Sequence, residues 1–292
     1  MKRSILGVAT AFLLVAAAAT AVVAADQRIK PYVLAAQGPG DVAEKVAAAR
    51  QALQAAGFEV AGEYAFSAAA HVLVVTDDEL KKAAAGTPTG GFAAVQRVAV
   101  TKVGEQVQVS YTNPAWMAGA YRLGSDLAGV AARLEAALGK AQEFGAKAGM
   151  TAKQLRSYHY MVTMPYFTDQ VVLAEYAGHA EALEQVAKGL AASPAVGLIA
   201  RVDLPGTEET LFCVAIRSGD GADAAVVKTT DTGALRHTAY LPYELLVSGK
   251  KAIMLHGKFR IAQSFPDLGM GTFMKISGAP DGIAKALKAA IR

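Results

Sequence analysis

The chain has 292 residues, of which 53% are hydrophobic and 18% charged, and its net charge is +4. Lys2 and Arg3 supply two of the four net positive charges, so the rest of the chain is nearly neutral and its charge gives no support for nucleic-acid binding. Cys213 is the only cysteine, which excludes an internal disulfide.

Residues 1–25 have the pattern of a secretory signal peptide. Lys2 and Arg3 precede an apolar run from 5 to 23, and small residues follow before Asp26. A signal peptide needs this basic start, apolar middle and small-residue exit, although the run also approaches the ~20 residues of a membrane helix. We expect cleavage, a periplasmic or secreted protein, and no stable membrane span after cleavage.

The remainder of the chain repeats one order of elements. Val33-Leu34-Ala35 and Val172-Leu173-Ala174 each open a unit of about 120 residues, an ordinary size for a domain. We therefore predict a first repeat over 26–145, a connector over 146–165 and a second repeat over 166–292.

Each unit begins with an amphipathic helix. Val46, Ala49 and Leu53 lie at helical spacing within 41–56, and Gly57 follows at a position typical of a left-handed cap. Val186, which is 140 positions after Val46, lies in the second predicted helix over 179–192.

Strands and hairpins follow in the same order. The runs 71–76 and 211–216 are short, apolar and rich in β-branched residues, which favours buried strands. A short helix is expected over 77–85, and hairpins around Gly104 and Gly249.

A helix closes each unit. Leu127, Val130 and Leu134 share one face of a helix predicted from 125 to about 144, and the connector is expected to extend that helix. The second closing helix covers 280–291. These elements bury their apolar faces only if helices cover a sheet, so we predict an α+β fold of two similar two-layer domains, each a small mixed sheet with helices packed on one face.

The segment from Gln106 through Asn113-Pro114 to Met117, followed by the helix over 127–138, resembles the family catalogued as domain of unknown function 302. The stretch Tyr240-Leu241-Pro242-Tyr243 is similar to the family's strand before its hairpin. The resemblance implies small α+β domains with helices on one face of a sheet, and it brings no catalytic residues. Many members have Cys where Tyr243 stands, and the second unit lacks the Asn-Pro step.

The string His159-Tyr-Met161-Val-Thr-Met164 is the strongest candidate for chemistry. If it is a strand, His159 and Met161 point to one face, and an imidazole with a thioether suits Cu(I). A flexible loop over 268–274 together with His256 would complete such a copper site. The alternatives are a core role for the methionines and a turn leading into a core strand at 268–274.

Two further features have simple readings. Gly90-Gly91 lacks the Lys-Ser/Thr and the strand-to-helix context of a P-loop, so a mobile loop is expected there. Cys213 lies in an apolar strand, where an inert buried thiol is expected, with a disulfide-linked dimer as the alternative.

The sequence favours an exported, non-catalytic binding protein whose partner is an unknown small ligand or an envelope protein, with the site in the groove between the repeats. Periplasmic copper handling and an envelope interaction module are the alternatives. An enzyme is the second hypothesis, and it would be favoured if His159, Tyr243 and an acidic residue met within hydrogen-bond reach in one cleft.

Overall fold

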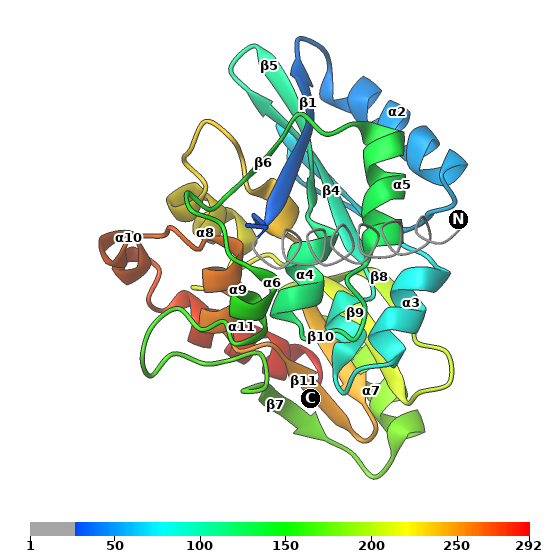
Figure 1. Cartoon of the computed structure of the whole chain (residues 1–292). Coiled ribbons are helices and arrows are strands. Elements are labelled where there is room, and N and C mark those ends of the chain that lie inside the picture. The colour runs from blue at the N-terminus through cyan, green and yellow to red at the C-terminus, as the bar shows by residue number, and fades with distance from the viewer. Residues whose placement is uncertain (1–26) are drawn as a thin grey trace, which may run out of the picture.

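The computed structural model describes residues 27–292, so the predicted signal peptide over 1–25 lies outside the described part. Two antiparallel sheets form the framework (Figure 1), with six strands in the order β2-β3-β4-β5-β1-β6 and five in the order β7-β11-β10-β9-β8. The predicted α+β class with two similar sheet domains is confirmed.

The elements of the first unit follow one another in this order: β1 (Tyr32–Gly38), α2 (Val42–Ala55), β2 (Glu59–Ser67), β3 (Ala70–Thr76), α3 (Asp78–Ala85), η1 (Gly90–Ala93), β4 (Gln96–Val103), β5 (Gln106–Thr112), α4 (Pro114–Ala120), α5 (Ala128–Leu138) and β6 (Gln142–Phe144). The connector that follows contains α6 (Ala152–Arg156).

The second unit has the elements β7 (Val171–Glu175), α7 (His179–Ala192), β8 (Val196–Asp203), β9 (Glu209–Ile216), α8 (Asp223–Thr230), η2 (Thr238–Tyr240), β10 (Tyr243–Ser248), β11 (Lys251–Met254), α9 (Gly257–Ser264), α10 (Met270–Lys275) and α11 (Ala279–Ala290). From β1 to α4 and from β7 to α9, the two units run through the same series of strands and helices. α11 then takes the place of α5.

The strand registers align the units residue by residue. One residue is left without a partner at Ala35 in the ladder between β1 and β5, and one at Leu173 in the ladder between β7 and β11. These two irregularities lie at equivalent points of the two sheets. Val33 is therefore equivalent to Val171, one residue away from the match to Val172 that the sequence suggested. Register rather than residue identity sets this equivalence, because a shift of one residue turns every side chain to the other face.

Local sequence explains the first helix. The Asp41 side chain accepts hydrogen bonds from the amides of Ala43 and Glu44, as a helix N-cap does, and Leu53 is fully buried. The helix ends before Gly57, whose φ is +83°, a value that favours glycine. The predictions of this helix and of the one over 179–192 are confirmed.

The predicted helix from 125 to about 144 is wrong in its second half. α5 ends at Leu138, and Gly139 follows with a φ of +92°. The chain then forms β6, which pairs with β1. The connector consequently does not extend the helix, and its helical part is the short α6.

Each sheet has two differently covered faces. α2 and α5 pack on one face of the first sheet, and α7 and α11 on one face of the second (Figure 1). The inner face of each sheet is covered by the other unit: η1 contacts β9 and β10, and η2 contacts β3, β4 and β5. The two units therefore share their cores, and both hydrophobic clusters include residues from both units.

The edge strands β2 and β8 meet at their equivalent bulges. A Cβ atom at Gly62 would lie 2.1 Å from the carbonyl oxygen of Ile199. Glycine is needed here because the two backbones approach too closely for any side chain.

A buried charge network crosses the interface between the units. Arg97 in β4 lies opposite Val74, and Glu244 in β10 lies opposite Cys213, so the register makes Arg97 and Glu244 equivalent positions. The Arg97 guanidinium pairs with the Glu244 carboxylate, which also pairs with Arg260. All three side chains are almost fully buried.

Arg260 of α9 completes the network. Its Nε donates to Glu244 Oε2 at 2.9 Å and its Nη2 to Oε1 at 3.1 Å. On the same helix, Gln263 accepts a hydrogen bond at 3.1 Å from Trp116 of the first unit. Polar and charged groups at the centre of the interface thus fix how the units dock.

Replacement of Glu244 by Gln is expected to lower the free energy of unfolding by about 3–5 kcal/mol, because two buried guanidiniums lose the carboxylate that they share. Urea denaturation measures the change. The matched variant Glu175→Gln breaks the exposed pair with Lys250 and is expected to have little effect. Equal losses in the two variants would contradict the assigned role of Glu244.

A second polar contact between the units involves Asp223. Its Oδ2 accepts hydrogen bonds from the Tyr64 hydroxyl at 2.8 Å and from the Ile216 amide at 2.9 Å. Its Oδ1 is buried without a partner among the described residues. Burial raises the pKa of Asp223 to about 7, although both hydrogen bonds favour the charged form.

This raised pKa predicts a pH dependence of stability. The unfolded chain releases the Asp223 proton near pH ~3.9, whereas the folded chain holds it to about pH 7. The folded state binds more protons in this window, so the stability that Asp223 contributes falls as the pH rises through it. We expect the fall in Tm between pH 5 and pH 8 to be smaller in Asp223→Asn than in wild type. Asp78→Asn, at an exposed carboxylate, should keep the wild-type profile.

Candidate functional site

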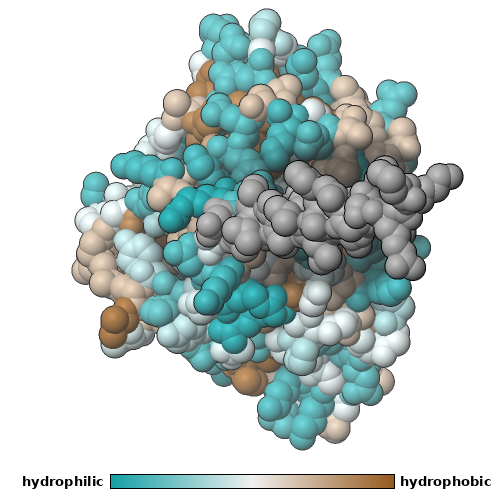
Figure 2. Space-filling model, in the orientation of Figure 1, coloured by the Kyte–Doolittle hydropathy of each residue, from teal (hydrophilic) through white to brown (hydrophobic). Residues whose placement is uncertain are grey.

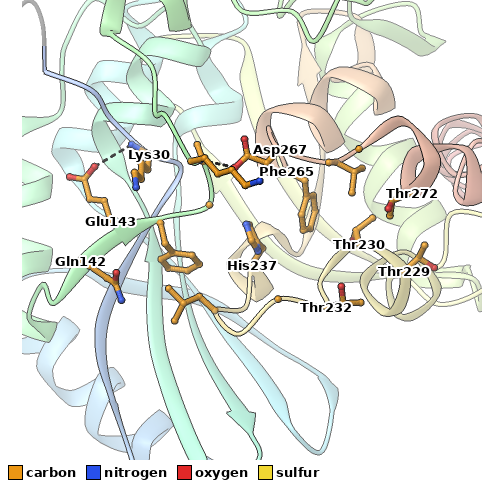
Figure 3. A pocket seen from close by; sticks show the side chains of 18 residues that line it. Lys30, Gln142, Glu143, Thr229, Thr230, Thr232, His237, Phe265, Asp267 and Thr272 are labelled. Carbon is orange, nitrogen blue, oxygen red and sulfur yellow. Dashed lines mark hydrogen bonds between the residues drawn. The ribbon is translucent and has the colours of Figure 1, made fainter.

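A pocket of about 470 Å³ opens at one side of the interface between the units (Figure 3). The first unit contributes Lys30 and the consecutive residues 142–147 of β6 and the segment after it. The second unit contributes residues between 229 and 237, at the end of α8 and the loop to η2, and residues between 265 and 272, around the start of α10.

His237 is held by a buried carboxylate at this pocket. Its Nδ1 lies 3.2 Å from Asp231 Oδ1, and its backbone amide donates to the same oxygen at 2.8 Å. The Asp231 side chain is 1% exposed. A carboxylate beside Nδ1 favours the tautomer with the proton on that atom, which leaves Nε2 as a hydrogen-bond acceptor.

Aromatic rings fix the plane of the imidazole. The Tyr32 ring meets it edge-on with centroids 5.1 Å apart, and the Phe265 and Phe144 centroids lie 5.0 and 5.6 Å away. Tyr32 and Phe144 come from neighbouring strands of the first sheet, whereas Phe265 follows α9. The imidazole therefore lies where both units meet.

Gly145 leaves the imidazole accessible. A Cβ atom at this position would lie 3.1 Å from His237 Nε2 and 2.8 Å from atoms of Pro31 and Tyr32. The φ of Gly145 is +96°, which strains any other residue. Glycine is thus needed at this position for two reasons: the backbone has a positive φ, and a side chain would crowd His237 Nε2.

The rim of the pocket is polar. The Lys147 amide donates to Asp267 Oδ2 at 2.6 Å, which ties the two units together, and the Lys30 amide donates to Glu143 Oε2 at 3.2 Å (Figure 3). Threonine side chains add hydroxyl groups at positions 229, 230, 232 and 272. The pocket thus combines an aromatic wall with hydroxyl, amide and charged groups at its mouth.

The residues of this site were not among those that the sequence singled out. Asp231 and His237 lie close together in a short polar segment, which is a weak signal for an oriented imidazole. Phe144 was predicted in a helix and Gly145 at the end of the first repeat, and neither assignment indicated a contact with His237.

The strand that was to carry the copper ligands does not form. Residues 157–170 contain neither helix nor strand, so the alternation that placed His159 and Met161 on one face is wrong. The His159 ring lies against the Tyr166 ring, with centroids 4.4 Å apart and planes tilted by 54°, and its Nδ1 is buried without a partner among the described residues. Met161 is 45% exposed. Copper binding by this pair stays a prediction.

The segment 268–274 has neither of the two structures predicted for it. Residues from Met270 onward form the helix α10, neither a flexible loop nor a turn into a core strand. His256 caps α9 through its Nδ1, which accepts from the Lys258 amide at 3.2 Å, and burial lowers the pKa of His256. In residues 27–292 no group of three or more His, Cys, Asp or Glu side chains is placed to hold a metal ion.

The glycine-rich segment binds a carboxylate of the other unit. The amides of Thr89 and Gly91 donate to the two carboxylate oxygens of Glu209, each at 3.1 Å, and Gly90 and Gly91 are buried in η1. The expectation of a mobile loop is wrong, because this segment is packed into the interface and its amides already hold an anion.

The Cys213 thiol is fully buried, as predicted, and burial raises its pKa to about 11. A disulfide-linked dimer through Cys213 is incompatible with this burial. Tyr243 is likewise buried, and its hydroxyl accepts a hydrogen bond from Tyr240 at 2.9 Å, so it forms no acid-base group with His159.

No family model, curated protein or solved structure matches the chain. The resemblance to domain of unknown function 302 therefore stays a prediction. Among residues 27–292, none of the helices has the length and apolar character needed to cross a membrane.

Proposed function

We propose that this is an exported binding protein that acts without catalysis and holds a small ligand in the His237 pocket between its two units. One observation carries the proposal: both units build the pocket, and a buried Asp231 orients an imidazole whose Nε2 faces it. The volume lies within the ~300–1,000 Å³ typical of small-molecule sites.

The lining favours a ligand with two different sides. Phe144, Phe265 and Leu235 offer an apolar wall for a compact, flat body. His237 Nε2 accepts a hydrogen bond, so the ligand should carry an N–H or O–H donor near its centre. The threonine hydroxyls and charged rim suit polar groups at its edge.

Binding is favoured over catalysis by the surroundings of the imidazole. Within the described residues, His237 Nε2 makes no hydrogen bond to a serine, threonine or cysteine side chain that it would activate. A histidine oriented in this way is thus a recognition group in the proposal.

An envelope interaction module is less favoured. A large apolar surface patch would mark such a module, and on the part of the face in Figure 2 that the grey atoms do not cover, the hydrophobic areas are small and separated by hydrophilic ones. The pocket offers a more definite site than this face does.

Native mass spectrometry of the purified chain tests the proposal. We expect a retained small molecule in wild type and at least about tenfold less in His237→Gln, because loss of one oriented hydrogen bond of about 1.4 kcal/mol lowers affinity by that factor. Phe265→Ala should lose the molecule as well.

The matched control is His71→Gln. His71 also pairs with a carboxylate, through Nε2 and Glu63 Oε2 at 3.0 Å, but it lies outside the pocket. It should retain the molecule as wild type does. A molecule that stays bound to both pocket variants, with circular dichroism unchanged, would overturn the assignment of the site.

A further inference from the structure

The lining of the His237 pocket carries groups of both charges. Besides His237 it includes the lysines Lys30 and Lys147 and the carboxylates Glu143 and Asp267. The class of ligand that the pocket takes depends on which of these groups the protein itself already satisfies.

Two carboxylates at the pocket have partners within the protein. Lys140 Nζ lies 3.0 Å from Glu143 Oε1. Behind the pocket wall, Asp231 is 1% exposed and is held by the amide and the Nδ1 of His237, and the Arg236 guanidinium donates to the Asp231 carbonyl. Glu143 is thus neutralised, and the Asp231 carboxylate is out of a ligand's reach.

Three charged groups of the lining have no such partner. Among residues 27–292 no ion pair includes Lys30, Lys147 or Asp267. Asp267 accepts only the Lys147 backbone amide, through Oδ2 at 2.6 Å. The pocket therefore offers two ammonium groups and one carboxylate to a ligand.

Asp267 and Lys147 belong to the segments that touch the imidazole. Asp267 comes two residues after Phe265, whose ring centroid lies 5.0 Å from that of His237. Lys147 comes two residues after Gly145, where a Cβ atom would lie 3.1 Å from His237 Nε2. The hydrogen bond from the Lys147 amide to Asp267 joins the two segments. An acceptor, a carboxylate and an ammonium group thus gather around one place.

The rest of the lining is apolar or neutral. Phe144, Leu235 and Phe265 supply the apolar wall, and the labelled threonines lie on the other side of His237 from Lys30 (Figure 3). A ligand that fits this arrangement has an apolar body and carries both a positive and a negative group at one end.

We propose that the ligand of this pocket is a zwitterion, namely an α-amino acid with an apolar side chain. Its ammonium group donates to His237 Nε2 and to Asp267, and its carboxylate pairs with Lys147 and Lys30. Its side chain packs against the phenylalanines. An anion without an ammonium group would leave Asp267 unpaired, and a cation without a carboxylate would leave both lysines unpaired. The inference rests on the proposed function and names the class of its ligand.

Isothermal titration calorimetry of the purified, dialysed chain tests the class. L-Phenylalanine and L-leucine are compared with 3-phenylpropionate, which lacks the ammonium group, and with 2-phenylethylamine, which lacks the carboxylate. We expect L-phenylalanine to bind at least about tenfold more tightly than either analogue, because each analogue leaves a charged group of the pocket without its partner. Equal affinities for L-phenylalanine and the two analogues would contradict the proposal.

Two variants assign the charges to their partners. Asp267→Asn still accepts the Lys147 amide, and it is expected to bind L-phenylalanine about tenfold more weakly but 3-phenylpropionate as wild type does. The double variant Lys30→Gln/Lys147→Gln should lose affinity for L-phenylalanine and 3-phenylpropionate and keep its affinity for 2-phenylethylamine. A loss of the same size for all probes in either variant would contradict these assignments.

The matched control is Lys275→Gln. Lys275 is an exposed lysine at the end of α10, outside the lining of the pocket. This variant should bind every probe as wild type does, so a general effect of removing positive charge is separated from the effect at the pocket.

Failure of this inference and failure of the proposed function give different results. If wild type binds none of the probes but still retains a molecule that His237→Gln loses, the amino-acid class is wrong and the pocket remains the site. If L-phenylalanine binds equally to wild type, His237→Gln and Phe265→Ala, the pocket itself is the wrong site.

Discussion

The architecture depends on one ion pair between equivalent positions. Arg97 and Glu244 occupy the same place in β4 and β10 of the two units, and they meet at the centre of the interface with Arg260. Two copies with identical residues at this position would bring like charges together in a buried site, which is strongly unfavourable. Opposite charges at this point therefore require that the two halves differ, and they fix the pairing of one half with the other.

The same docking creates the pocket, but on one side only. β6 pairs with β1 in the first sheet, and among the described residues the second sheet has no sixth strand. The segment after β6 brings Gly145 over His237 and the Lys147 amide to Asp267. A nearly symmetric fold thus acquires an asymmetric site through a short addition to one unit.

Sequence patterns predicted the elements whose signals are local. The period of Val46, Ala49 and Leu53 and the following Gly57 predicted α2, and the hairpins at Gly104 and Gly249 lie where expected. Local signals did not predict the parts of the structure that depend on contacts between residues far apart in the chain. An alanine-rich run suggested helix up to about 144, but pairing with β1 makes its last residues a strand. The site was not predictable for the same reason, since His237 meets Phe144 and Tyr32 only after both sheets have docked.

The reciprocal covering of the sheets constrains how the chain reaches its native state. The inner face of the first sheet is covered by η2, which lies more than 90 residues beyond the last strand of that sheet. During synthesis the first half must therefore exist for a time with an apolar face and a lone arginine exposed, until the second half arrives. A chain cut between the repeats would leave two fragments, each with the inner face of its sheet uncovered until it meets the other.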